Sequence, residues 1–149
     1  MTDRTNSRKT EKGQSLTELA LMMVFLLILL AGVVDVGRAL FAYIAIRDAA
    51  QEGALVGSID PLNDCTVVES RVRESSNMPV DLSDTNIISV DCRLPASYCV
   101  GEPVGVTVTY DNFPLTMPFM GTLIGSQSIE ISASITDTLV TNDPDAGCP

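Results

Sequence analysis

Glu18 is the residue whose setting most strongly suggests chemistry. It lies at the start of an otherwise apolar stretch, residues 19–34. A carboxylate at the centre of a bilayer costs about 2.5–3.5 kcal/mol, and less near the interface. Glu18 therefore either lies shallow and reaches the lipid headgroups, or is neutralised by a positive group. A cut after Gly13 would supply that group, because Gln14 would then carry a new ammonium that could pair with the Glu18 of a neighbouring subunit.

The other reactive side chains are four cysteines, all beyond the apolar stretch: Cys65, Cys92, Cys99 and Cys148. None belongs to a CxxC pair and the chain has no histidine, so a zinc site built from the four thiolates is poorly spaced. In an oxidising exterior, two disulfides are the better interpretation. Of the three pairings, we favour Cys92–Cys99, which closes a loop around Pro95, with Cys65–Cys148 holding the tail.

The sequence offers little for catalysis. Without histidine there is no Ser-His or Cys-His arrangement. Gly121 and Gly125 lie in a proline-rich segment and do not form a phosphate-binding loop. Asp81 and Asp84 are weak candidates for calcium, since acidic loops are usually only solvated. We therefore expect no enzyme activity, no metal site and no cofactor.

The element that positions Glu18 is an expected membrane-spanning helix over residues 14–35. The 21 residues from Gln14 to Val34 would extend about 31 Å, which matches a hydrocarbon core of about 30 Å. The apolar positions form no stripe, which argues against a soluble amphipathic helix. Asp35 and Arg38 mark the far edge, where they are three residues apart and can pair.

The charges indicate an orientation and exclude one class of partner. Four basic side chains precede the span, and only Arg38 and Arg47 follow it closely, so the positive-inside bias places the N-terminus in the cytoplasm. The formal charge is −10 for the whole chain. From residue 14 onward, five arginines face seventeen acidic side chains, a formal charge of −12. Such a chain repels nucleic acid.

The helix is expected to continue outside the membrane over residues 36–57. No proline occurs before Pro61, and Gly57 followed by Ser58 favours a stop there. Small residues recur every four positions in this half: Ala45, Ala49, Gly53 and Gly57. A small-residue stripe lets another backbone approach closely. Such a stripe either packs against the protein's own sheet or packs against helices of other subunits. The two kinds of contact can coexist on different faces of the helix.

Residues 58–140 predict a small extracytoplasmic α+β domain. We expect a short helix over about 65–76, capped by Asn63 or Asp64, and three strands over about 85–92, 104–110 and 127–139. The strands should form an antiparallel sheet packed on the long helix. Residues 141–149 form an acidic tail.

Residues 112–125 are expected to form a long loop with exposed apolar side chains: Phe113, Leu115, Met117, Phe119 and Met120. These side chains either cover the sheet edge or lie near the membrane, or they form a docking patch for a partner.

The order of basic leader, Gly13, four residues, Glu18 and long apolar helix resembles the class III signal of type IV pilin-like proteins. The run from Gly13 through Asp35 to Ala49-Ala-Gln-Glu-Gly53-Ala is similar to the TadE-like pseudopilins of tight-adherence (Tad/Flp) pilus systems. Residues 110–119 resemble the strand-exit segment of those proteins. The four cysteines and the glutamine at the expected cut are departures from the family pattern.

The resemblance implies a structural pilus component rather than an enzyme. A prepilin peptidase would remove a cytoplasmic leader, residues 1–13, and leave a mature chain whose Gln14 amine is retained and methylated. Implied partners are that peptidase, other pilin or pseudopilin subunits, the Tad assembly machinery and the membrane, with incorporation in an extracellular pilus. The alternatives are a single-pass anchored interaction domain uncut at Gly13, or a cleaved signal peptide, although the span exceeds the usual 7–15-residue apolar region.

Overall fold

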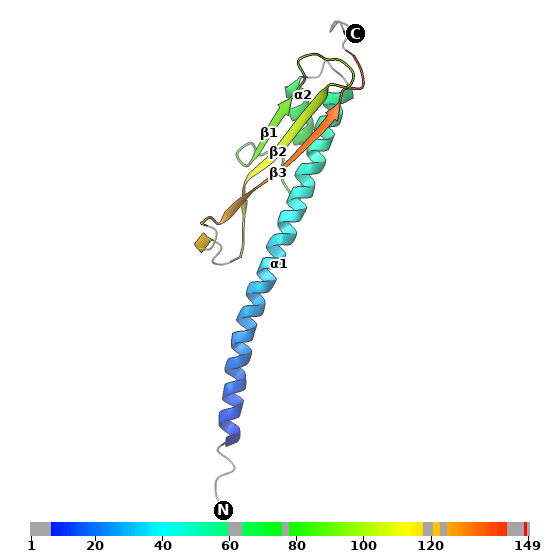
Figure 1. Ribbon diagram of the computed structural model, residues 1–149. Coiled ribbons are helices and arrows are strands. Elements are labelled where there is room, and N and C mark those ends of the chain that lie inside the picture. Colours follow the sequence, from blue (N-terminus) through cyan, green and yellow to red (C-terminus); the bar gives the residue numbers. More distant parts are fainter. Residues whose placement is uncertain are drawn as a thin grey trace, which may run out of the picture.

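The protein is an α+β molecule with a long helix, a short helix and a three-stranded antiparallel sheet, as predicted (Figure 1). The computed structural model describes residues 7–59, 64–75, 78–117, 121–122, 125–142 and 148, with side chains from Gly13 onward. The elements are α1 (Ser7–Ile59), α2 (Cys65–Glu74), β1 (Ile88–Arg93), β2 (Pro103–Pro114) and β3 (Ser128–Thr138).

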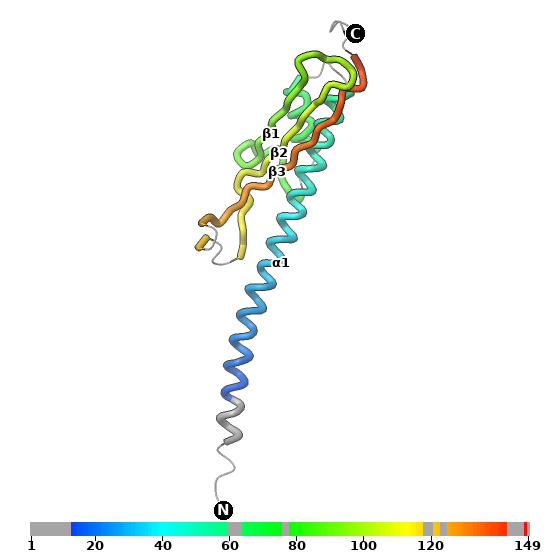
Figure 2. The backbone as a smooth tube through the Cα atoms, in the orientation of Figure 1, coloured from blue at the N-terminus to red at the C-terminus, as the bar shows by residue number. Residues whose placement is uncertain are grey.

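The long helix α1 has 53 residues, which corresponds to a length of about 80 Å. Figure 2 shows it as one continuous rod, with the sheet and α2 lying against its C-terminal half only. It exceeds the predicted helix at both ends. The expected stop at Gly57 is wrong, because the helix continues to Ile59. Gly57 is held in the helix by close packing: a Cβ built on it would lie 2.9 Å from Cγ1 of Val104.

The sheet has the order β1-β2-β3, with β2 at its centre. Val104, Val106 and Val108 of β2 are fully buried and alternate with more exposed residues, as the sequence pattern predicts. They face α1, whose buried surface consists mainly of alanine with Ile46 at its centre. Because alanine and glycine are small, the sheet lies close to the helix backbone.

The central strand extends four residues beyond its predicted end at Tyr110. An irregularity in the β2–β3 register lies between Tyr110 and Phe113, and pairing resumes with Phe113 opposite Ile129. The expectation that Phe113 is an exposed loop side chain is wrong, because the irregularity turns it into the core, where it is 4 % exposed. Its ring meets Tyr110 edge-to-face at 5.5 Å.

The short helix α2 is capped as predicted. The Asp64 carboxylate accepts hydrogen bonds from the backbone N–H groups of Thr66 and Val67, at 3.0 and 3.1 Å. Asn63, the other candidate cap, lies outside the described residues. Val68 and Val72 are the buried positions of α2.

The first strand begins three residues later than expected, at Ile88. The carbonyl of Asp84 accepts the N–H groups of Ile87 and Ile88, and its carboxylate accepts the N–H of Asn86 at 2.9 Å. This turn occupies residues 84–87 and delays the start of the strand.

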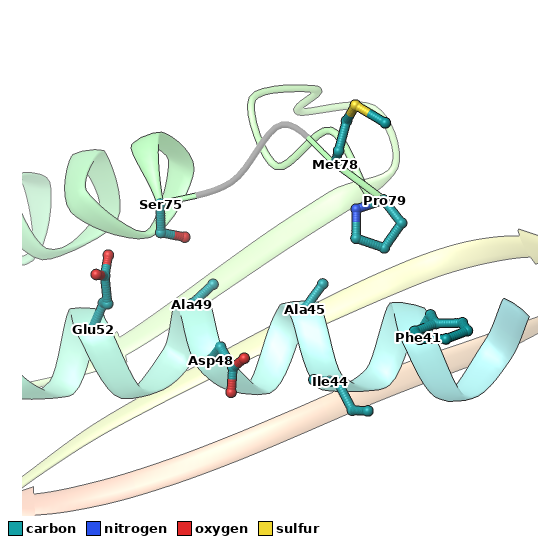
Figure 3. Close-up of a pocket in the computed structure, with 9 residues that line it drawn as sticks. All are labelled: Phe41, Ile44, Ala45, Asp48, Ala49, Glu52, Ser75, Met78 and Pro79. Carbon is teal, nitrogen blue, oxygen red and sulfur yellow. The ribbon is translucent and has the colours of Figure 1, made fainter. Parts of the chain in front are cut away.

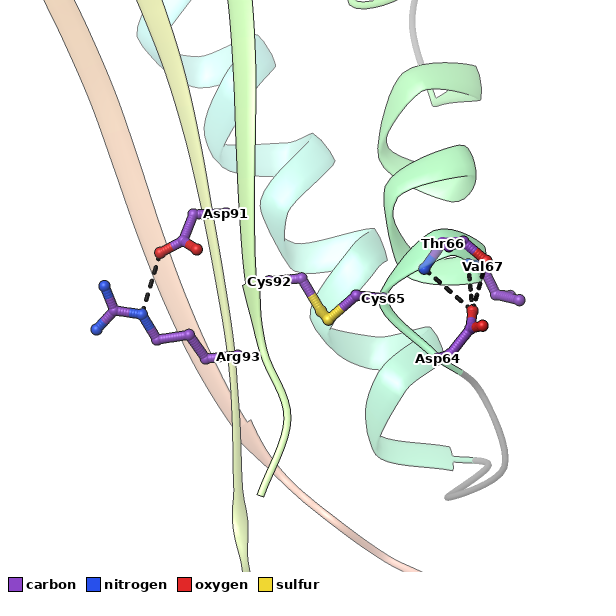
Figure 4. Close-up of a disulfide and its surroundings, with 7 residues drawn as sticks. All are labelled: Asp64, Cys65, Thr66, Val67, Asp91, Cys92 and Arg93. Atoms are coloured by element: carbon purple, nitrogen blue, oxygen red, sulfur yellow. Dashed lines mark hydrogen bonds and ion pairs between the residues drawn. A yellow bond between two sulfur atoms is a disulfide. The ribbon is translucent and has the colours of Figure 1, made fainter. Parts of the chain in front are cut away.

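Both disulfide pairings expected from the sequence are wrong. Cys65 is joined to Cys92, and Cys99 to Cys148. Figure 4 shows Cys65 at the start of α2, with its sulfur directed at β1. Cys92 lies on the same face of β1 as Ile88 and Val90, towards the helices, which places it opposite Cys65 of α2.

Cys99 lies in that loop, beside the segment that follows β3. The N–H of Val100 donates to the side-chain carbonyl of Asn142 at 2.6 Å, and the N–H of Gly101 donates to the carbonyl of Leu139 at 2.9 Å. The segment after β3 therefore lies beside the loop that contains Cys99, which is consistent with the Cys99–Cys148 bond.

Candidate functional site

The candidate cut site lies within α1 and is open to its surroundings. Gly13 is helical and exposed, and a Cβ built on it would meet no atom within 4 Å. Gln14 and Glu18 are also exposed. The Thr17 hydroxyl donates to the Gln14 carbonyl at 2.8 Å. No other described part of the molecule covers this segment, so an enzyme approaching from the side could reach it.

The apolar stretch after Glu18 remains uncovered. Most of its large side chains are half or more exposed, from Val34 at 50 % to Leu21 at 74 %, and Ile28 is partly buried. Among the described residues, α1 is the one helix long and apolar enough to cross a membrane. An exposed apolar surface of this size is stable only against lipid or another protein.

Asp35 lies at the upper end of this stretch and is 4 % exposed. Its carboxylate accepts a hydrogen bond from the Thr116 hydroxyl and another, at 2.6 Å, from the N–H of Met117. Both partners lie on the β2–β3 connection. The Arg38 guanidinium pairs with Asp35 at 3.6 Å, as the spacing predicts, and donates to Thr116 at 3.0 Å.

The Asp35 cluster therefore fixes the β2–β3 connection to α1. We define this cluster as Asp35, Arg38, Thr116 and Met117. The sequence predicted the Asp35–Arg38 pair but gave no indication of the two partners, which are about 80 residues away in the chain. Arg38 also lies over the ring of Phe113, 5.4 Å from its centre, which orients the guanidinium towards the connection.

The small-residue stripe of α1 faces the protein's own domain. Ala45 and Ala49 are buried, and Gly53 and Gly57 lie against α2 and β2. A Cβ built on Gly53 would lie 2.5 Å from Cγ2 of Val72. A helix from another protein could use this stripe only by displacing α2 and the sheet.

The opposite face carries exposed apolar side chains along the C-terminal half of α1: Val36, Leu40, Tyr43, Ile44, Leu55 and Ile59. They continue the exposed apolar surface of the N-terminal half. An exposed apolar surface therefore extends along most of the helix.

A cavity of about 340 Å³ lies between α1 and the connection after α2 (Figure 3). Met78, which is 83 % exposed, and Pro79 form one wall, and Phe41 closes one end. Asp48 and Glu52 supply two carboxylates from α1. Within the part of the chain that the structure describes, no group of three or more potential metal ligands occurs here or elsewhere.

The carboxylates of the two calcium candidates, Asp81 and Asp84, accept hydrogen bonds from residues close in the chain. The Asp81 carboxylate accepts hydrogen bonds from the hydroxyl and the N–H of Ser83, at 2.6 and 3.0 Å. These hydrogen bonds, that from the hydroxyl above all, lower the pKa of Asp81. Asp84 caps the turn before β1. Both residues therefore act as turn formers in the structure.

Comparison with known proteins identifies the helical part of the molecule. A search of curated proteins and a search of solved structures gave no match. The family model described as TadE-like protein matches residues 13–55, which begin at the candidate cut site and cover most of α1. Residues 110–119, the other segment with a resemblance, lie outside this match. Residues 13–55 therefore form a TadE-like protein domain, as the sequence resemblance predicted.

Proposed function

We propose that this chain is a TadE-like pseudopilin, a structural component of a tight-adherence pilus, cut after Gly13 by a prepilin peptidase. In this proposal residues 1–13 are a cytoplasmic leader and residues 14–35 span the membrane. Residues 36–57 and the α+β domain lie outside. Its partners are other pilin or pseudopilin subunits and the Tad assembly machinery, and the mature chain is built into an extracellular pilus.

The observation that carries this proposal is the division of α1 into two chemically different halves. The first half is exposed and apolar, while the second is covered on one face by its own sheet and α2. A helix that only supported a soluble domain would not need an uncovered apolar half. A subunit whose helix lies in a bilayer and then joins a bundle of helices needs one. The TadE-like match begins at Gly13, the residue expected to precede the cut.

Glu18 has a role in this proposal that follows from the cut. The new Gln14 ammonium and Glu18 are four residues apart, so they lie on one face about 6 Å apart along the helix. Within the described residues Glu18 has no ion pair. The amine, from the same chain or from a neighbour, would neutralise it on the way into the bundle.

The first experiment is the intact mass and N-terminal sequence of the protein isolated from its native membrane. We expect a start at Gln14 with a methylated amine. A start at Met1 or Thr2 would mean an uncut single-pass anchor and would overturn the pilus proposal. A start well beyond residue 30 would make the apolar stretch a signal peptide. Pyroglutamate at residue 14 in all molecules would refute the retained amine.

A pair of glycine variants separates recognition of the cut site from folding. Gly13→Leu should block processing, and the uncut precursor should accumulate in the membrane. Gly37→Leu is the matched control, because a Cβ at residue 37 also meets no atom within 4 Å. Both variants should fold, since neither position is packed. Unchanged processing of Gly13→Leu would contradict the peptidase assignment.

A further inference from the structure

A second cavity, lined mainly by apolar side chains, lies where the β2–β3 connection meets α1. We call it the border groove; its volume is about 540 Å³. Its main walls are three side chains from α1 and three from the sheet side of the molecule: Leu29, Val33, Val36, Leu115, Met117 and Ile129. The Asp35 cluster holds these two walls together.

The border groove extends below the expected membrane surface. Leu29 precedes Asp35 by six residues, which is about 9 Å along the helix axis. Met117 packs over Gly32, with its sulfur 3.6 Å from the position a Cβ would occupy. Because the apolar span ends at Val34, the lower part of the groove lies at the depth of acyl chains in the extracytoplasmic leaflet.

The chemistry of the groove favours a hydrocarbon chain over a peptide. Asp35 is its one polar lining residue among those described, and its two carboxylate oxygens already accept hydrogen bonds from Thr116 and Met117. An extended peptide would bring backbone N–H and C=O groups that find no partner there. An acyl chain needs none, and the groove is continuous with the lipid-facing surface of α1.

Arg38 lies at the height along α1 where the phosphate of a lipid in the groove is expected. It is three residues beyond Asp35, about 4.5 Å closer to the domain, and its side chain is 44 % exposed. A guanidinium carries five N–H donors in a fork that suits phosphate oxygens, and the Asp35 and Thr116 contacts use only Nη1, which leaves Nε and Nη2 for a phosphate.

We propose that the border groove binds one phospholipid of the extracytoplasmic leaflet, with an acyl chain between α1 and the β2–β3 connection and the phosphate at Arg38. This inference rests on the proposed membrane insertion of α1. The β2–β3 connection is then a second membrane contact, which holds the domain on the bilayer until the subunit is extracted. Lipid must leave the groove when the helix enters a filament.

Fluorescence quenching tests this directly, because the chain contains no tryptophan. Single-tryptophan variants Met117→Trp, Leu30→Trp and Val140→Trp are placed in vesicles of phosphatidylethanolamine and phosphatidylglycerol brominated in the upper acyl chain. Met117→Trp reports the groove. Leu30→Trp reports insertion, because Leu30 is 57 % exposed and lies outside the groove lining. Val140→Trp reports the exposed far end of the domain. We expect strong quenching of the first two and none of the third.

The outcomes distinguish a failure of the lipid-binding proposal from a failure of the proposed membrane insertion. Quenching of Leu30→Trp without quenching of Met117→Trp overturns the lipid groove and leaves membrane insertion intact. Quenching of neither overturns insertion itself. A third outcome is that the emission of Met117→Trp is blue-shifted, is not quenched and depends on the protein-to-lipid ratio. This result would identify a second copy of the chain in the groove and would overturn the proposal that it binds a phospholipid. If Met117→Trp loses its native circular dichroism, Leu115→Trp reports from the same wall.

Native mass spectrometry of the detergent-solubilised protein gives an independent measurement. The wild-type chain should retain one phospholipid. Gly32→Leu, which fills the groove under Met117, should lose it, and Gly37→Leu should retain it. Arg38→Gln should lower retention several-fold, because the phosphate loses its charged donor. Equal retention in all four proteins would overturn the proposed site.

Discussion

At the scale of single residues, Gly53 sets the distance between the two helices. No side chain separates the α1 backbone from Val72 of α2, and a Cβ at residue 53 would also lie 3.4 Å from Val106 of β2. Three elements therefore meet at one glycine. Its role is to allow close approach, since its helical backbone would suit any residue.

Gly53→Ala should destabilise the domain by about 1–3 kcal/mol, because the added methyl group overlaps Val72 in a closely packed core. Thermal unfolding of the full chain in detergent, followed by circular dichroism, measures the effect. Gly37→Ala on the same helix is the control, and it should lose no stability because its Cβ meets no atom within 4 Å. Equal melting temperatures for the two variants would contradict this packing.

The Asp64 cap makes stability depend on pH. The Thr66 hydroxyl and then the Val67 N–H lower the pKa of Asp64 below its ordinary value. Its contribution is therefore complete above the pKa of the unfolded chain and is lost as the pH falls through the lower pKa of the folded state. Asp64→Asn keeps a capping side chain but cannot titrate. We expect its unfolding free energy to fall less than that of the wild type on acidification, and parallel pH profiles would exclude this contribution.

At the scale of elements, the disulfides fix α2 to β1 and the tail to the loop after β1. Trypsin distinguishes this pairing from the other two, because it cleaves after Arg71, Arg73 and Arg93. Without reduction, we expect the peptide containing Cys65 joined to the peptide containing Cys92. The peptide that begins at Leu94 should be separate and internally bridged. A single species joining all three peptides would show either alternative pairing.

The Asp35 cluster should protect the β2–β3 connection from hydrogen exchange. Asp35→Ala removes the acceptor of the Met117 N–H, so exchange at that amide should become about tenfold faster or more. Asp111→Ala, which removes an exposed carboxylate of β2, is the control and should leave Met117 protected. Unchanged exchange in Asp35→Ala would mean that the connection is held by its apolar contacts alone.

The sequence predicted those elements whose signal is local. The unbroken apolar run gives α1, the valine alternation gives β2, and Asp64 before an amphipathic segment gives α2. It failed where distant residues decide. The pairing of Cys92 depends on α2 folding against β1, which brings Cys65 to it. The burial of Phe113 depends on an irregularity against β3. The partners of Asp35 depend on how the β2–β3 connection folds back on the helix.

At the scale of the whole molecule, one unbroken helix joins the apolar half to the domain. The Asp35 cluster adds a second link, from the β2–β3 connection to the same helix. The position of the domain relative to the apolar half is therefore fixed by two connections, the continuous helix and the Asp35 cluster. A change in one link should have little effect while the other is intact.

Gly37→Pro tests this double connection, because proline removes a helical hydrogen bond and bends the helix. Nitrogen relaxation of β2 amides in nanodiscs should change little in Gly37→Pro or in Asp35→Ala. In the double variant the domain should reorient faster than the disc. Additive effects of the two substitutions would show that the links do not share this role.

The disulfide connectivity has a consequence for export. The bonds join the first cysteine to the second and the third to the fourth, 27 and 49 residues apart. In the proposed topology, with α1 held in the bilayer, thiols emerge on the far side in chain order. An oxidase that joins each thiol to the next one to appear then makes both native bonds, whereas nested or crossed pairing would require an isomerase. We therefore expect oxidative maturation in that topology to need an electron acceptor and no isomerase.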